Sequence, residues 1–367
     1  MNCAFVCFSK YQLMNCINIV KSFGEYKTYK KDLFISSKIS VDNDINIDLI
    51  YKYNLFDNVF IYNDSNYSCF MKKIVLRIIE ILNPHICIKN MLLNREDYEK
   101  VKKRYEKLFI SYQHGIGIAL SFITDRNNIN YYDDGMASYY DDRQQHKKIR
   151  RLIYTLLFHN LNYIKPTNLY VYEKSIITDN IKHFYKKIYS IPKIKDKYII
   201  DILNDIFSIH NKHINYDKKI IYLTQPNDDK LKSNDYMNTE ILSLLSKYRE
   251  NVLIRKHPRV AYSFRDYNID TNKNLWELNF VDHLNSDMIL IGNSSTAQIT
   301  PKLVFDLEPT LVFTFKLYKN MYSKEVTDRL VSLLNNIKNC YRNPEKVLIL
   351  SNKEELIVAL NDYIYNC

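Results

Sequence analysis

The sequence predicts an α/β protein of two domains, each built on a parallel β-sheet that is covered by helices. Its 367 residues correspond to roughly two domains of about 150 residues each. Short apolar runs rich in β-formers alternate along the chain with longer segments of helical periodicity, which is typical of parallel sheets. The chain is 46% hydrophobic and 25% charged. That composition belongs to a globular protein and excludes a disordered, collagen-like or coiled-coil chain.

The first domain is expected to alternate strands and helices from its start. A helix from Tyr11 should end at Gly24 as a C-cap, and an amphipathic helix over 70–82 should stop before Pro84. A basic helix is expected over 146–165, closed by the proline that follows it. The predicted strands of this domain cover 3–8, 34–36, 58–62, 108–112 and 129–132.

We place the domain boundary in the lysine-rich segment around Pro192, which gives domains over 1–192 and 193–367. Helices such as 238–248 separate the compact apolar runs of the second domain, and a closing helix over 353–365 could pack on either domain. The predicted strands of the second domain cover 219–224, 252–256, 288–291 and 311–315.

Cysteine content, charge and hydropathy restrict the cellular setting. Seven cysteines without a CxxC pair suggest neither a zinc site nor a disulfide framework, so a reducing cytosol is expected. The chain opens without a secretory signal pattern, and no run approaches the roughly 18 apolar residues of a membrane span. The net charge of +11 favours phosphate-bearing substrates, anionic lipid or nucleic acid as partners.

Glycine is scarce, with five residues in the whole chain. A composition so poor in glycine should keep it only where a Cβ would clash or where φ must be positive. The five positions are Gly24, Gly115, Gly117, Gly135 and Gly292.

The first candidate site follows the predicted strand over 129–132, where Asp133 and Asp134 precede Gly135. Adjacent carboxylates repel, which raises the pKa of one of them, and glycine lets a substrate approach the backbone. The pattern is typical of a general base or a sugar-binding carboxylate, and equally of an ordinary Asp-Asp-Gly turn.

The second candidate site ends the strand over 252–256, where His257 precedes Pro258 and Arg259. Proline keeps the residue before it extended, so the imidazole should stand at the strand end. Histidine can protonate a leaving group near neutral pH, and Arg255, Lys256 and Arg259 would attract a phosphate. The alternative is a structural histidine.

The third candidate site follows the strand over 288–291. The N–H groups at a helix start bind anions, and small hydroxyl residues add donors, although serine is also a common N-cap. No GxGxxG or GxxxxGK[ST] pattern is present. Glu277 precedes this site and could accept hydrogen bonds from a ribose, or could be a surface carboxylate beside a packed tryptophan. The residues of the site are Gly292, Ser294, Ser295 and Thr296.

The order of these motifs resembles that of bacterial sialyltransferases, most closely the family-52 glycosyltransferases that sialylate lipooligosaccharide and capsule. These enzymes share an acidic-acidic-glycine motif, a His-Pro motif and a serine-rich motif, and the segment CFSKYQL is similar to their first strand and the glutamine that follows it. The matching residues are Asp133-Asp134-Gly135, His257-Pro258, Ser294-Ser295-Thr296 and Gln12.

The resemblance implies a GT-B fold, in which two Rossmann-like domains face each other across a cleft, with the acceptor on the N-terminal side and the donor on the C-terminal side. It implies CMP-sialic acid as donor, inversion at the anomeric carbon, and no cofactor or divalent metal. A carboxylate would deprotonate the acceptor hydroxyl while His257 stabilises the departing CMP. For the base, Asp228 comes first, Asp134 second and Asp133 third.

The implied acceptor is a galactose hydroxyl on a bacterial surface glycan, with no nucleic acid as partner, and related enzymes can form homodimers. The expected location is cytoplasmic, peripheral on the inner face of the membrane. One alternative is another CMP- or CDP-dependent transferase, of the glycerophosphate or Kdo type. Another is a non-catalytic basic protein that binds membrane or nucleic acid, for example through the segment over 147–165.

Overall fold

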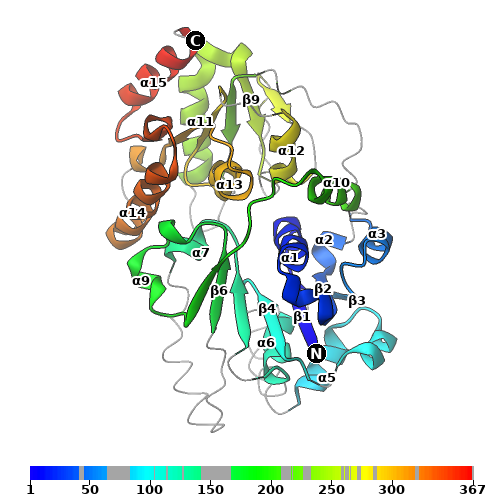
Figure 1. The fold of residues 1–367 in the computed structure, drawn as a ribbon. Coiled ribbons are helices and arrows are strands. Elements are labelled where there is room, and N and C mark those ends of the chain that lie inside the picture. The colour runs from blue at the N-terminus through cyan, green and yellow to red at the C-terminus, as the bar shows by residue number, and fades with distance from the viewer. Residues whose placement is uncertain are drawn as a thin grey trace. The chain divides into compact units, whose positions relative to one another are not determined.

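The computed structural model describes residues 1–40, 45–63, 83–102, 104–112, 115–125, 128–141, 167–207, 216, 218–225, 233–257, 260, 264, 266–270, 274–283, 287–318 and 322–365. The chain divides into two compact units (Figure 1). Unit 1 comprises Met1–Lys174 with Asp179–His210, and unit 2 comprises Ser175–Thr178 with Asn211–Cys367.

Unit 1 contains a seven-stranded sheet in the order β3-β2-β1-β4-β5-β6-β7, and each neighbouring pair is parallel. Its strands are β1 (Asn2–Cys7), β2 (Lys30–Ser36), β3 (Asn58–Tyr62), β4 (Lys107–Ile110), β5 (Ile129–Tyr132), β6 (Asn168–Val171) and β7 (Lys187–Ser190). The helices are α1 (Lys10–Ser22), α2 (Ser37–Ser40), α3 (Ile47–Lys52), α5 (Pro84–Met91), α6 (Gly115–Phe122), α7 (Ala137–Tyr140), α9 (Asp179–Lys182) and α10 (Lys197–Ile206). Two short 3₁₀ helices of this unit are η1 (Gly24–Thr28) and η3 (Arg95–Lys100), and a third, η5 (Lys174–Ile176), begins at the last residue before the segment Ser175–Thr178 of unit 2.

Unit 2 contains a six-stranded sheet in the order β10-β9-β8-β11-β12-β13, again with every neighbouring pair parallel. Its strands are β8 (Ile220–Leu223), β9 (Val252–Arg255), β10 (Asn268–Asp270), β11 (Ile289–Gly292), β12 (Thr310–Phe313) and β13 (Val347–Ile349). The helices are α11 (Ser233–Leu245), α12 (Trp276–His283), α13 (Thr296–Phe305), α14 (Lys324–Cys340) and α15 (Lys353–Tyr365), with 3₁₀ helices η6 (Ser246–Asn251), η7 (Phe315–Leu317) and η8 (Pro344–Lys346).

Both sheets have the strand order of the doubly wound Rossmann fold. When the strands of each unit are numbered along the chain, they lie side by side in the sheet in the order 3-2-1-4-5-6, and unit 1 adds a seventh strand at the end. The chain therefore leaves the sheet centre in opposite directions after the first strand and after the fourth. The predicted α/β class with two Rossmann-like sheets is confirmed.

The division between the units lies at 210/211, whereas the sequence placed it at 192/193. Strand β7, which ends just before Pro192, and helix α10, which follows it, both belong to unit 1. Strand β7 pairs with β6 on the sheet edge, and α10 packs against α1 and α3. The N–H of Asn46 donates to the carbonyl of Ile206 over 2.8 Å, which fixes the end of α10 to this unit. The polar composition around Pro192 therefore marks a loop inside unit 1.

The closing helix α15 belongs to unit 2, where Leu356 and Leu360 join the core formed by β8, β9 and β11. The strands expected over 58–62 and 129–132 have the predicted bounds. The C-cap expected at Gly24 is wrong, because α1 ends at Ser22 with Phe23 as its cap. The helices expected over 70–82 and 146–165 lie outside the described residues. Among the described helices, none is both long enough and apolar enough to cross a membrane.

Candidate functional site

The carboxyl ends of parallel strands at the point where the strand order reverses are the usual ligand sites of such sheets. In unit 2 this point lies between β8 and β11, and in unit 1 between β1 and β4. The predicted motifs follow β9 and β11 in unit 2, and β1 and β5 in unit 1. In each sheet, the described residues of these motifs therefore follow the carboxyl ends of the strands.

In unit 2 the strands β9, β8 and β11 end in register, with Leu223 opposite both Arg255 and Gly292. Adjacent strands lie about 4.8 Å apart, so the ends of β9 and β11 are about 10 Å apart, with β8 between them. This spacing brings His257 and the start of α13 to one edge, where a phosphate with its attached groups could lie between them.

His257 follows β9 by two residues and is half-buried, so it does not belong to the hydrophobic interior. Its N–H donates to the hydroxyl of Thr224 over 2.9 Å, and its carbonyl accepts from the N–H of Val260 over 2.9 Å. The N–H of Thr224 donates in turn to the carbonyl of Arg255 over 3.2 Å. The turn after β8 therefore holds the backbone of His257 in place.

Helix α13 begins with a complete capping box. The Ser295 hydroxyl accepts from the N–H of Ala297, and Gln298 Oε1 accepts from the N–H of Ser295 over 3.1 Å. Gln298 Nε2 donates to the carbonyls of Leu290 and Val312 over 3.3 and 3.0 Å. One buried glutamine thus ties the helix start to β11 and β12.

Gly292 is required by this glutamine. A Cβ at position 292 would stand 2.8 Å from Gln298 Oε1 and 2.9 Å from Cδ, closer than real Cβ contacts allow. The sequence prediction that this glycine occupies a place where a Cβ would clash is confirmed. Gly135 meets the other condition, with φ at 91°. Gly24 meets neither, since a Cβ there has nothing within 4 Å.

The remaining residues of the serine motif lie beside a tyrosine that the sequence did not indicate. The hydroxyls of Ser294 and Tyr322 are 2.9 Å apart, and burial raises the pKa of Tyr322. Thr296 is the first residue of α13 and is half-buried. Together with Ser295, four hydroxyl groups therefore belong to the start of this helix and its surroundings.

Glu277 lies in the first turn of α12 and is 6% exposed, so it is an interior carboxyl and not a surface one. Burial raises its pKa to about 7, against the opposing effects of a backbone hydrogen bond, the Arg255 charge and Thr300. The indole N–H of Trp276 donates to the carbonyl of Ala297 over 3.0 Å, which fixes α12 against the first turn of α13.

Arg255 does not have the role that the sequence suggested. Its guanidinium donates to Asp270 Oδ2 over 2.7 Å and to the carbonyl of Asn274 over 2.9 Å, and it lies 5.6 Å from the Trp276 ring centroid. The hydroxyl of Tyr216 also donates to Asp270. Arg255 is thereby committed to holding β9, β10 and the start of α12 together, and is not a free phosphate ligand.

In unit 1, Asp133 is fully buried and accepts three hydrogen bonds. The donors are the hydroxyls of Tyr11 at 3.0 Å and of Tyr139, and the N–H of Gly135 at 2.7 Å. Burial raises the pKa of Asp133 to about 6, although all three hydrogen bonds oppose the shift. This carboxyl therefore organises the loop after β5.

Asp134 is the more accessible of the two aspartates. Gln12 Nε2 donates to Asp134 Oδ1 over 2.6 Å, and Gln12 Oε1 accepts from the N–H of Phe8 over 2.7 Å. The hydrogen bond from the Phe8 N–H fixes the orientation of the Gln12 side-chain amide, so that its NH₂ group points at Asp134. The structure thus brings together Gln12 and Asp134, which are 122 positions apart in the chain and were singled out separately.

Asp228, Pro258 and Arg259 lie outside the described residues. Thr224, Gln298, Tyr139 and Tyr322 were missed in the sequence, because hydroxyl, amide and tyrosine residues are common in this chain and only the strand order places them at the sites. Among the described residues, no group of three or more His, Cys, Asp or Glu side chains is placed to hold a metal ion.

Comparison with known proteins gives structural matches only. No family model matches the sequence, and no curated protein matches it. A protein from Listeria monocytogenes assigned as a UDP-N-acetylglucosamine 2-epimerase aligns with 100% of this chain and 88% of its own, at 11% identity and a TM-score of 0.52. The UDP-GlcNAc 2-epimerase of Neisseria meningitidis, bound to UDP-GlcNAc, aligns with 98% of this chain and 99% of its own, at 13% identity and a TM-score of 0.49. The calicheamicin glycosyltransferase CalG4 aligns with 99% of this chain and 98% of its own, at 6% identity and a TM-score of 0.46.

The Listeria alignment covers the whole chain and shows the fold, which is the two-domain α/β fold of the GT-B type. At this identity the likeness concerns the fold alone. The sialyltransferase resemblance accordingly rests on the motif residues.

Proposed function

We propose that the chain is an inverting glycosyltransferase that moves sialic acid from CMP-sialic acid to a galactose hydroxyl on a bacterial surface glycan, without a metal ion. The observation that carries the proposal is the edge of the unit 2 sheet. There His257, Thr224 and the hydroxyl-lined start of α13 follow neighbouring strands at the reversal of strand order. A nucleotide phosphate is the group that such an edge suits best.

In this proposal the phosphate of CMP lies at the start of α13. Ser294 and Thr296 supply N–H and hydroxyl donors, Ser295 supplies its hydroxyl because its N–H donates to Gln298, and the helix dipole favours the negative charge. Glu277 lies one helix away, and in its protonated or ionised form it could exchange hydrogen bonds with the ribose. Its burial makes this the least accessible of the proposed donor contacts.

The transfer breaks the bond between the anomeric carbon of sialic acid and a phosphate oxygen of CMP, and forms a bond to the acceptor oxygen. The bonding pair of the broken bond leaves with the phosphate, and His257 donates a hydrogen bond or a proton to that oxygen. The proton of the acceptor hydroxyl passes to a carboxylate. Attack on the face opposite the leaving group inverts the configuration.

For the base we keep Asp228 first, because it follows β8 on the unit that carries His257, and Asp134 second. Asp133 is the weakest candidate, since it is fully buried and already accepts three hydrogen bonds. Variants Asp228→Asn and Asp134→Asn separate the first two. The base variant should lose about 10²-fold or more in turnover, while the other should retain most of it.

The proposed location is cytoplasmic and peripheral, at the inner face of the membrane, since the net charge of +11 favours anionic lipid. Cell fractionation tests this point. We expect release from membranes by a high-salt wash, and recovery entirely in the soluble fraction at low salt would contradict it.

The activity is tested by incubating the purified chain with CMP-sialic acid and lactose, as a galactose-terminated acceptor, and measuring CMP release and the sialylated product. CDP-glycerol and CMP-Kdo test the other transferase types. UDP-GlcNAc tests the epimerase activity named for two of the structural neighbours. Product from CMP-sialic acid alone supports the proposal, and turnover of another donor in its place overturns it.

His257→Ala should lower turnover by about 10²-fold or more, the usual scale for loss of a general acid, with an unchanged melting temperature. The matched control is His183→Ala, which removes an exposed histidine of unit 1. If His257→Ala and His183→Ala had the same turnover, His257 would be a structural residue and not a catalytic one.

A further inference from the structure

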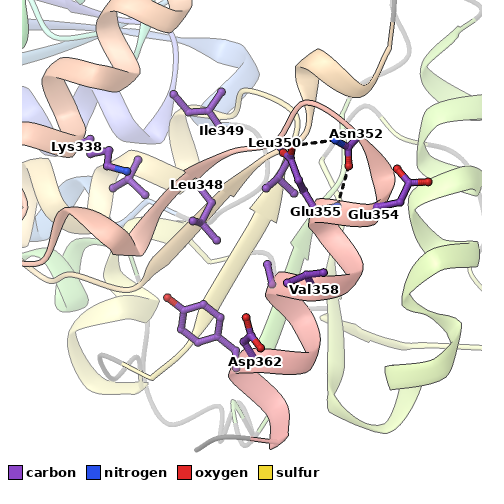
Figure 2. Close-up of a pocket in the computed structure, with 12 residues that line it drawn as sticks. Lys338, Leu348, Ile349, Leu350, Asn352, Glu354, Glu355, Val358 and Asp362 are labelled. Atoms are coloured by element: carbon purple, nitrogen blue, oxygen red, sulfur yellow. Dashed lines mark hydrogen bonds between the residues drawn. The ribbon is translucent and has the colours of Figure 1, made fainter.

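A groove of about 660 Å³ runs along β13, the last strand of the unit 2 sheet (Figure 2). It is lined by β13, by the end of α14 and by one side of α15. Four consecutive residues over 347–350 line it. Side chains of a strand alternate between the two faces of the sheet, so a hollow that touches four in a row lies along the strand's edge.

The backbone of β13 presents unpaired groups to this groove. The N–H of Leu350 donates to the carbonyl of Phe313 over 3.1 Å. Because backbone groups alternate in direction along a strand, the N–H and carbonyl groups of both Leu348 and Leu350 point toward β12. The N–H and carbonyl of Ile349 consequently point away from β12, toward the groove, whereas the N–H of Val347 already donates to the carbonyl of Pro344 in η8. In the described part of the chain, no strand pairs with this edge. Such an edge can accept one more strand.

The wall opposite β13 is formed by α15, which combines an apolar side chain with carboxylates (Figure 2). Val358 is 58% exposed, an unusual degree for an aliphatic residue that lines a groove. Glu354 and Asp362 are exposed on the same helix. Glu355 is committed to the turn before α15, because the N–H of Ser351 and Asn352 Nδ2 both donate to it over 2.8 Å.

The single cation of the groove, Lys338, lies 3.9 Å from Glu345 outside it. The groove is therefore acidic on a chain whose net charge is +11. A second copy joined edge to edge through β13 would bring Glu354 and Asp362 of both copies together. Like charges placed opposite each other in this way disfavour self-association.

We propose that this groove binds an extended, cationic segment of a partner protein, which adds as a strand to β13. Its backbone pairs with Ile349, its apolar side chains contact Val358 and Leu348, and its lysine or arginine side chains reach Glu354 and Asp362. The proposal concerns the edge of the sheet and is independent of the donor site after β11.

The test uses the full chain and the fluorescein-labelled hexapeptide Lys-Thr-Val-Thr-Lys-Thr, called the lysine-valine peptide, whose lysine and valine side chains lie on one face of a strand. Binding is followed by fluorescence anisotropy. Ile349→Pro removes the outward N–H without breaking the bonds to β12, so the fold should tolerate it. It should weaken binding by about tenfold or more, since a buried peptide carbonyl loses its donor. The matched control Ile349→Val keeps the N–H and should bind as the parent does.

The charge is tested by the double variant Glu354→Gln with Asp362→Asn, which should weaken binding by about three- to tenfold. The same hexapeptide with glutamate in place of both lysines, called the glutamate-valine peptide, should not bind. If Ile349→Pro fails to fold, a lysine-valine peptide with its alternate amide nitrogens methylated replaces it, and should bind the parent chain at least about tenfold more weakly.

Three results would overturn the proposal. Equal binding of the lysine-valine peptide by the parent chain and Ile349→Pro would exclude strand addition. Equal affinity for the glutamate-valine peptide would exclude the charge selection. Concentration-dependent dimerisation that Ile349→Pro abolishes would show a second copy as the occupant instead.

Discussion

Replacing Glu277 by glutamine should stabilise unit 2 at neutral and alkaline pH. The carboxyl is buried in the first turn of α12, and burial raises its pKa from 4.5 to about 7. A group whose pKa is raised in the folded state binds more protons there than in the unfolded chain between these two values. Stability is therefore highest below pH 4.5 and falls as the pH rises toward 7, where the buried carboxylate becomes charged.

The size of the effect follows from the shift. The difference between 4.5 and about 7 corresponds to about 3 kcal/mol, at about 1.4 kcal/mol for each pH unit. Glutamine has the same shape and carries no charge. The gain in free energy of unfolding for Glu277→Gln over the parent should therefore be near zero at pH 4.5, and should approach about 3 kcal/mol above pH 7.

Urea unfolding at pH 5 and pH 8, followed by tryptophan fluorescence, measures this difference. Trp276 is the single tryptophan of the chain and lies next to Glu277, so its emission reports unit 2. Glu250→Gln, at an exposed carboxylate of the same unit, is the matched control and should show no such pH-dependent gain. A gain for Glu277→Gln that is equal at both pH values, or a loss at pH 8, would refute the reasoning.

Three further changes test the sites. Asp133→Ala removes the buried acceptor of Tyr11, Tyr139 and the Gly135 N–H, and should lower the free energy of unfolding of unit 1 by about 3 kcal/mol or more. Hydrogen exchange of the β5 amides measures this loss, and an unchanged exchange rate would contradict the hydrogen-bond network. Gly292→Ala places a Cβ against the fixed amide of Gln298 and should lower the free energy of unfolding of unit 2 by about 1–3 kcal/mol, which is seen as a lower urea midpoint of the Trp276 transition. An unchanged midpoint would show that Gln298 can move. Gln12→Ala removes one hydrogen-bond donor from Asp134 and should leave most of kcat in place if Asp228 is the base, whereas a loss of about tenfold would favour Asp134. The affinity for CMP should be unchanged because the proposed CMP site is in unit 2, and weaker CMP binding would argue against that division of roles.

The sequence was sufficient to predict the class and the two sheets, because buried parallel strands appear as apolar runs. The run before Gly292 is entirely buried, and its strand and helix were correctly placed. Strands β6, β7, β10 and β13 were missed. Each is three or four residues long, which leaves too short an apolar run to recognise, and polar residues at the ends of β6, β7 and β10 shorten that run further. The same weakness moved the domain boundary, since β7 was not recognised beside Pro192.

The candidate residues could be named from motif spacing, but their environment could not. The commitment of Arg255 to Asp270 depends on β10 pairing with β9, which no local pattern reveals. The contact of Gln12 with Asp134 depends on β4 lying between β1 and β5. The difference between Asp133 and Asp134 arises from Tyr11 and Tyr139, two of 32 tyrosines that composition alone could not distinguish.

The most direct test of the donor site is a crystal structure of the chain with CMP, supported by calorimetric titration. We expect the phosphate to accept hydrogen bonds from the start of α13 at Ser294–Thr296, with the imidazole of His257 on its other side. The titration should show binding that Ser295→Ala weakens. CMP bound elsewhere on the chain, or no binding of CMP where UDP binds, would contradict the account.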